Sequence, residues 1–102
     1  MSQLQILLKH KSTVSEILRT YGKQFNQITG RYSDGRNGRC AIGVLMSYVG
    51  WDGRDDLDAA NNLLAASDEL KHAGINQNLL IAMNDSGISF DEIANYLNSI
   101  GK

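Results

Sequence analysis

The sequence contains no proline, one cysteine (Cys40) and two histidines among its 102 residues. Without proline, no position forces a helix to kink or to end. A single cysteine excludes an intrachain disulfide, and one cysteine with two histidines is fewer than the four ligands of a typical structural zinc site. The composition therefore permits long helices throughout, and we predict neither a metal site nor a cofactor.

Long hydrophobic runs are also absent, since no apolar run approaches the roughly 18 residues that a membrane span needs. The segment Met1–Lys11 lacks the basic start, the long apolar stretch and the cleavage site of a secretory signal. Hydrophobic residues make up 42% and charged residues 21% of the chain, as in ordinary globular proteins. We expect a soluble cytoplasmic protein without membrane contact, and a chain of this length predicts one domain over residues 1–102.

Charge is divided unevenly along the chain, although the net charge is only −1. Through Arg54 there are eight lysines and arginines against three acids, whereas from Asp55 onward two lysines face eight acids. Such a division produces a basic surface that attracts anions, or head-to-tail association of copies into a homo-oligomer. We favour the simpler alternative, in which the two halves pack together and neutralise each other.

The most hydrophobic stretch extends from Gly38 to Trp51 and has only Arg39 and Ser47 as strongly polar residues. A helix that is apolar on nearly all sides is typical of a domain interior, and we place it at about residues 39–49. Gly43 costs about 1 kcal/mol against alanine in a helix, which indicates a close approach of another backbone. The predicted fold class is all-α: a compact single-domain bundle of four to five helices around this central apolar helix.

Capping residues and amphipathic periodicity predict the surrounding helices. Their expected bounds are residues 4–21 with a break near Ser12, about 55–73, 76–84 and 89–100. Thr13 and Ser89 are each followed three residues later by glutamate, which is the capping-box pattern. In the helix at 55–73, one side is expected to face the core, and it is formed by Leu57, Ala60, Leu64, Ser67 and Leu70/Lys71. Trp51 is expected to fold back onto the core.

Residues 23–38 lack periodicity and are rich in glycine, asparagine, aspartate and arginine, which predicts an irregular loop. Within it, Asp34-Gly35 predicts a tight turn. A short hairpin is the less favoured alternative, because an isolated hairpin is only marginally stable.

Arginines accumulate just before the central helix. Backbone N–H groups and the dipole at a helix amino terminus favour anions, and Gly-rich segments with arginines are a common way to bind phosphate. We therefore identify Arg31, Arg36, Arg39 and Cys40 as candidate anion-binding residues. The pattern is not a nucleotide-binding motif, and the favoured alternative is a solvated loop whose arginines pair with the acidic second half.

Cys40 is also a candidate nucleophile, because a thiol at a helix start next to Arg39 loses its proton more readily. His10 or His72 would then serve as the base. However, no cysteine-hydrolase signature accompanies Cys40, and Cys-Ala-Ile-Gly-Val-Leu is typical of a buried core segment. We therefore predict no catalytic residue.

The segment Asp85–Leu97 resembles the first two helices and turn of helix-turn-helix DNA-binding proteins, with a glycine turn followed by a capped Ile-Ala-x-x-Leu helix. That family implies a basic recognition helix in the major groove. Here the segment carries Asp85, Asp91 and Glu92 and no lysine or arginine, whereas phosphate contacts dominate DNA affinity. We favour an ordinary helical hairpin and expect no nucleic-acid partner.

Two short motifs, Gly38–Leu45 and Met83–Gly87, together resemble a family of small uncharacterised proteins of bacteria, phages and archaea. The family shares Cys-Ala-x-Gly-x-Leu, a later Asn-Asp and a terminal amphipathic helix. This chain departs from the pattern in Val44, where a small residue is frequent, and in its longer acidic middle helix. The resemblance implies one compact helical domain and a phage, archaeal or bacterial origin, and it implies no catalytic residue.

These patterns together predict a small non-enzymatic binding protein that sequesters a protein partner or a phosphate-bearing small ligand through its arginine loop. A helix-turn-helix-like transcriptional regulator is the alternative. A Cys-dependent hydrolase is the least favoured interpretation.

Overall fold

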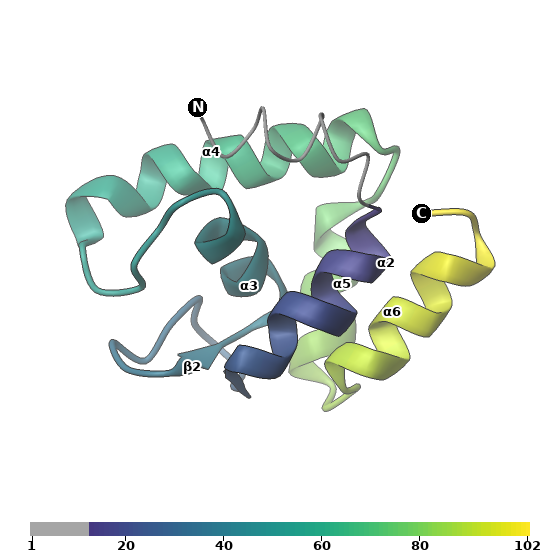
Figure 1. Cartoon of the computed structure of the whole chain (residues 1–102), viewed down its shortest axis with the longest axis horizontal. Coiled ribbons are helices and arrows are strands. Elements are labelled where there is room, and N and C mark those ends of the chain that lie inside the picture. Colours follow the sequence, from purple (N-terminus) through teal and green to yellow (C-terminus); the bar gives the residue numbers. More distant parts are fainter. Residues whose placement is uncertain (1–12) are drawn as a thin grey trace.

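Helices account for most of residues 13–102, the part of the chain that the computed structural model describes, apart from the side chains of residues 56 and 57 (Figure 1). The predicted helix before Ser12 lies outside the described residues. The helices are α2 (Val14–Thr20), the 3-10 helix η1 (Tyr21–Gln24), α3 (Ala41–Tyr48), α4 (Asp56–His72), α5 (Gln77–Asp85) and α6 (Phe90–Ser99).

A small parallel sheet corrects the prediction of an all-α fold. Strands β1 (Asn26–Gln27) and β2 (Gly38–Arg39) pair in parallel, so the loop between them crosses from one end of the strand pair to the other. The Cα radius of gyration is 12.2 Å, close to the value of about 13 Å expected for a compact domain of 100 residues. The coarser prediction of a compact, mostly helical domain is confirmed. No helix within the described residues is long and apolar enough to cross a bilayer.

Local capping signals set the helix starts as predicted. The Thr13 hydroxyl accepts a hydrogen bond from the backbone N–H of Glu16, and Ser89 with Glu92 forms a complete capping box. Asn76 caps α5 in the same manner. These side chains satisfy N–H groups that lack a partner inside the helix, and each is typically worth about 1 kcal/mol.

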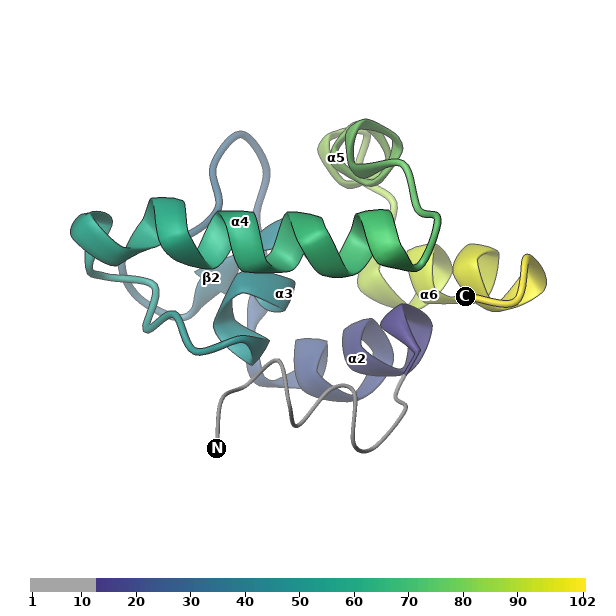
Figure 2. The same ribbon diagram turned by 90° about the horizontal axis from the view of Figure 1, so that it is seen from above.

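Helix α3 is buried along its length from Ala41 to Ser47, and α2, α4 and α5 all pack against it (Figures 1 and 2). A Cβ atom at Gly43 would collide with the backbone carbonyl oxygen of Tyr32. The close approach of a second backbone is therefore confirmed. The helix begins at Ala41, about two residues later than predicted, because Arg39 belongs to β2 and Cys40 is the N-cap.

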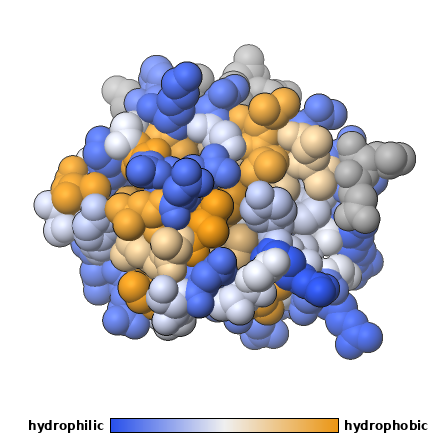
Figure 3. All heavy atoms as spheres, turned by 180° about the vertical axis from the view of Figure 1, so that it is seen from behind, coloured by the Kyte–Doolittle hydropathy of each residue, from blue (hydrophilic) through white to orange (hydrophobic). Residues whose placement is uncertain are grey.

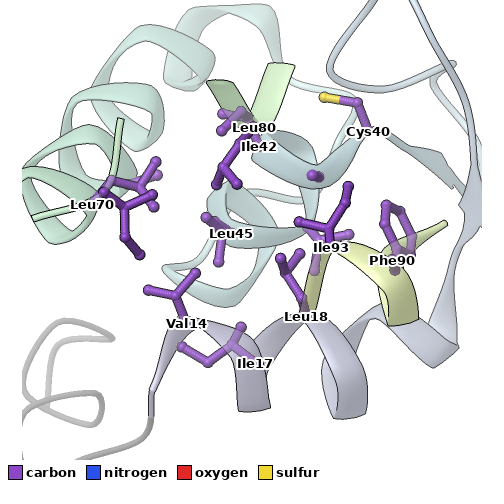
Figure 4. Packing of buried hydrophobic residues seen from close by; sticks show 14 of the residues in the cluster. Val14, Ile17, Leu18, Cys40, Ile42, Leu45, Leu70, Leu80, Phe90 and Ile93 are labelled. Carbon is purple, nitrogen blue, oxygen red and sulfur yellow. The ribbon is translucent and has the colours of Figure 1, made fainter. Parts of the chain in front are cut away.

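The core lies between α3 and the pair of helices at the two ends of the described chain. Helix α2 contributes Val14, Ile17 and Leu18, and α6 packs beside it with Phe90 and Ile93 (Figure 4). This pairing brings residues near 15 to residues near 95, so the first and last described helices lie side by side.

Helix α4 buries Leu70, as the predicted stripe requires, but not Leu64. Leu64 is 64% exposed, whereas Ala66 and Leu70 are buried and Leu63 packs against the core. Leu63 and Leu64 are adjacent, so helical spacing alone fits two stripes that differ by one residue. The choice between the stripes depends on tertiary packing, and the prediction for Leu64 was wrong.

Trp51 folds back onto the core, as predicted, and is only 6% exposed. Its indole N–H donates a hydrogen bond of 2.9 Å to the backbone carbonyl of Asp55. The polar end of the ring is thereby satisfied at the turn into α4, as buried tryptophans usually require.

Candidate functional site

The loop between β1 and β2 folds back over the start of α3. At its tip the predicted tight turn is present, with Gly35 at a φ of +80°, which glycine adopts without strain. The Asp34 carboxylate accepts hydrogen bonds from the backbone N–H groups of Arg36 and Gly38, and these bonds lower the pKa of Asp34. Ser33 and Arg39 form one antiparallel bridge, so the hairpin does not extend beyond a single pair.

Arg39 is turned inward and is only 3% exposed. Its Nε donates to the Ser47 hydroxyl at 2.9 Å, and its other nitrogens donate to Ser33 Oγ and to three backbone carbonyl oxygens. Those carbonyls belong to Arg36, Gly38 and Asp52. The guanidinium therefore joins the β1–β2 loop, helix α3 and the segment that follows α3.

The energetic cost of burying the Arg39 charge is offset by nearby carboxylates and aromatic rings. Burial lowers the pKa of Arg39, while the negative charges of Asp34 and Asp52 oppose that shift. The guanidinium carbon also lies 4.6 Å from the ring centroid of Phe25 and 5.8 Å from that of Trp51, within the range of cation–π attraction. Arg39 thus has a structural role, and its guanidinium offers no free side to an anion.

A second buried polar network joins α5 to the same loop. The amide oxygen of Asn84, a residue that is 1% exposed, accepts from the backbone N–H of Ala41 at 3.0 Å and from Gln27 Nε2 at 2.9 Å. Its amide nitrogen donates to the Ile28 carbonyl at 2.8 Å. Gln27 in turn donates to the Ile88 carbonyl and accepts from the Phe90 N–H, which fixes the α5–α6 turn.

These contacts bring together the two motifs that lie some forty residues apart in the sequence. Between the β1–β2 loop, the start of α3 and α5 is a cleft of about 260 Å³ that we call the Cys40 cleft. In Figure 2 the loop and α5 both rise on the same side of α4. The cleft is lined by Gly30, Arg31, Tyr32, Cys40, Ile42, Ile81, Asn84 and Asp85.

Two of the four predicted ligand-binding residues, Arg31 and Cys40, line this cleft. The other two do not: Arg36 is exposed at the tip of the loop, and Arg39 is buried beneath it. The four residues are therefore close in sequence but do not form one surface.

The amino terminus of α3 also differs from an open anion site. The backbone N–H of Ala41 donates to the Asn84 side chain, and that of Gly43 donates to the Cys40 sulfur at 3.4 Å. Two of the donors that a phosphate would use at a helix start are thus already occupied by the protein.

Cys40 itself is shielded rather than activated. It is 7% exposed, and burial raises the pKa of its thiol above the ordinary value. In Figure 4 its sulfur points toward the side of α3 on which Leu80 lies. A nucleophilic cysteine needs the opposite shift, because the thiolate is the reactive form.

Several residues of the cleft were not identified from the sequence. Tyr32, Ile81 and Asp85 line it, and Gln27 and Asn84 hold its walls together. The Asn84 side chain bonds to Ala41, Gln27 and Ile28. A signal for its actual role was its position four residues after the buried Leu80, since a polar side chain on the buried side of a helix needs an internal partner.

A larger hollow of about 340 Å³ lies between α2, α3, α4 and the carboxyl-terminal Lys102. Thr13 borders it, and the residues before Thr13 are outside the described structure, so we assign no function to this hollow.

Among the described residues, no group of three or more histidine, cysteine, aspartate or glutamate side chains is arranged to hold a metal ion. Comparisons with family models, curated proteins and solved structures found no match to this chain. The resemblance to small microbial proteins therefore stays a prediction.

Replacement of Arg39 by lysine tests its structural role. A single ammonium group cannot reach the oxygens that the guanidinium now joins, so Arg39→Lys should lower the free energy of unfolding by roughly 2–4 kcal/mol in urea titrations. Arg36→Lys is the matched control and should change it by less than about 0.5 kcal/mol. Equal effects of the two substitutions would contradict the inward role of Arg39.

Alkylation of Cys40 tests its shielding. With iodoacetamide at pH 8, the native protein should react at least roughly tenfold more slowly than the same protein in guanidinium chloride. Because burial raises the pKa of the thiol, the native rate should keep rising with pH beyond the point where the rate of the unfolded chain levels off. A native thiol that reacts as fast as the unfolded one would argue for an accessible nucleophile.

Proposed function

We propose that this protein is a non-enzymatic binding protein that sequesters a small ligand in the Cys40 cleft. The observation that carries the proposal is the cleft itself, which is lined by the apolar or aromatic Tyr32, Ile42 and Ile81 and by two exposed charged residues, Arg31 and Asp85. A concave, mainly apolar site with a few polar groups is the usual form of a small-molecule site.

The side chains that line the Cys40 cleft favour a non-enzymatic binding function over catalysis. The thiol of Cys40 has a raised pKa, and no histidine is among the described residues that line the cleft. His72 borders the larger hollow instead, and His10 lies outside the described residues. A Cys-dependent hydrolase would need a base within hydrogen-bond reach of the sulfur.

Arg31 is the residue that we propose to contact a negatively charged group of the ligand. It is exposed and lines the cleft. Arg36 lies at the exposed loop tip, where it can attract anions at long range but does not line the cleft. A phosphate-bearing small molecule is one example of such a negatively charged ligand.

We further propose that α3 is the centre of a helical bundle, with the cleft at its amino-terminal end.

A protein partner is a second candidate, supported by exposed apolar side chains. Leu64 of α4 is 64% exposed and Leu79 of α5 is 41% exposed. Figure 3 views the molecule from the side on which α5 lies, and hydrophobic side chains gather in the middle of that face. Exposed apolar patches are frequent at protein interaction sites.

DNA binding receives less support from the surface of the α5–α6 hairpin. Asp85, Asp91 and Glu92 are exposed there, and the sequence from Gln77 to Gly101 contains no lysine or arginine. Most of the affinity of DNA-binding proteins comes from neutralised phosphates. We therefore propose the helix-turn-helix-like regulator only as the alternative to a binding protein.

Mapping of a small-molecule library by NMR tests the proposed function. Bound compounds should shift the amide resonances of Arg31, Tyr32, Ile81 and Asp85 in the full-length protein. Ile81→Trp should abolish those shifts by filling the cleft, whereas Ile100→Trp, a control at an exposed position away from the cleft, should leave them unchanged. If no compound perturbs the cleft, or if the perturbed residues lie elsewhere, the proposal is wrong.

A further inference from the structure

We infer that the ligand of the Cys40 cleft is a small zwitterion, in which one negative and one positive group flank an apolar body, as in a free amino acid with an apolar side chain. This inference rests on the proposed small-ligand function and names the class of its ligand.

The charges at the cleft carry the argument. Arg31 on the loop and Asp85 at the end of α5 both line it, and both are exposed, so the opening presents one positive and one negative group. The Asp85 carboxylate is held in place, because one of its oxygens accepts a hydrogen bond of 3.2 Å from the backbone N–H of Gly30. A ligand charge of either sign can therefore be paired, and a ligand with both signs pairs with both residues.

A doubly negative ligand fits the same surroundings less well. Attraction of a phosphate to Arg31 would be opposed by repulsion from Asp85, because both side chains line one small cleft. The N–H groups of Ala41 and Gly43, which could compensate at the helix start, already donate to Asn84 and Cys40. The cleft therefore favours ligands whose own charges sum to zero.

Size and wall composition define the body of the ligand. The cleft volume of about 260 Å³ lies just below the range of roughly 300–1,000 Å³ that is usual for drug-sized ligands. Its interior is formed by Ile42, Ile81 and the un-ionised Cys40 thiol, with the half-buried Tyr32 at one side. A branched aliphatic or thioether side chain fits such walls, whereas a nucleotide exceeds the space.

Titration of the full-length protein with three matched probes tests this inference. L-Leucine carries both charges, 4-methylpentanoate lacks the ammonium group, and 3-methylbutylamine lacks the carboxylate. Calorimetry near pH 7 should show that leucine binds at least tenfold more tightly than either analogue, a difference of about 1.4 kcal/mol.

Substitutions at the two charges should separate their roles. Asp85→Asn should weaken the binding of leucine about tenfold without weakening the binding of 4-methylpentanoate, which has no ammonium group. Arg31→Gln should weaken the binding of leucine without weakening that of 3-methylbutylamine, which has no carboxylate. Asparagine retains an oxygen for the Gly30 N–H, so the loop contact persists. Asp91→Asn and Arg36→Gln are the matched controls outside the cleft and should bind leucine as the unmodified protein does.

The possible failures are distinguishable. Equal binding of leucine and 4-methylpentanoate, tighter binding of inorganic phosphate than of leucine, or no leucine binding while other compounds map to the cleft would overturn the zwitterion inference and leave the small-ligand function standing. If neither these probes nor the NMR library perturbs the cleft, both proposals are wrong.

Discussion

The side-chain amide of Asn84 is the contact on which the arrangement of the cleft depends. It accepts hydrogen bonds from the start of α3 and from β1, and it donates one to the backbone just after β1, although it belongs to α5. Without it, the buried N–H of Ala41 and the partly buried carbonyl of Ile28 would lack these partners, and an unsatisfied buried group costs roughly 1–3 kcal/mol. Apolar side chains could not replace this amide, because the Ala41 N–H needs an acceptor and the Ile28 carbonyl needs a donor.

Arg39 complements Asn84 by bonding to a different part of the same loop, Ser33 and the carbonyl of Arg36. The two strands contain only two residues each, so their backbone pairing alone provides few hydrogen bonds to hold the residues between them. The Arg39 guanidinium supplies further bonds to carbonyl and hydroxyl oxygens, and Asp34 organises the tip. Buried polar side chains thus hold an irregular loop against a hydrophobic core, which gives the Cys40 cleft a defined wall.

Features set by neighbouring residues could be predicted from the sequence. The caps at Thr13 and Ser89, the turn at Asp34-Gly35 and the close backbone approach at Gly43 each follow from local chemistry, and the structure contains all of them. The buried side of α4 could not be predicted, because two adjacent leucines fit two stripes equally well. The parallel pairing of β1 with β2 was also missed, since two-residue strands leave no alternation to detect.

Only part of the cleft lining could be identified from the sequence, because the rest depends on contacts between segments far apart in the chain. Arg31 and Cys40 were identified from their closeness to a helix start, and both line the cleft. The opposite orientations of Arg36 and Arg39 could not be inferred, because they depend on where Ser47 and the Asp52 carbonyl lie in the folded chain. Asp85 and Asn84 come from a segment more than forty residues later, and only the tertiary fold brings them to Cys40.

Hydrogen exchange in an Asn84→Ala variant tests this account most directly. If the amide bridge holds the loop, backbone amides in residues 26–32 and at Ala41 should exchange markedly faster than in the unmodified protein, while amides in the interior of α6 keep most of their protection. Asn78→Ala, at an exposed position on the same helix, should leave exchange in the loop unchanged. Unaltered protection of residues 26–32 in Asn84→Ala would contradict the central role of the bridge.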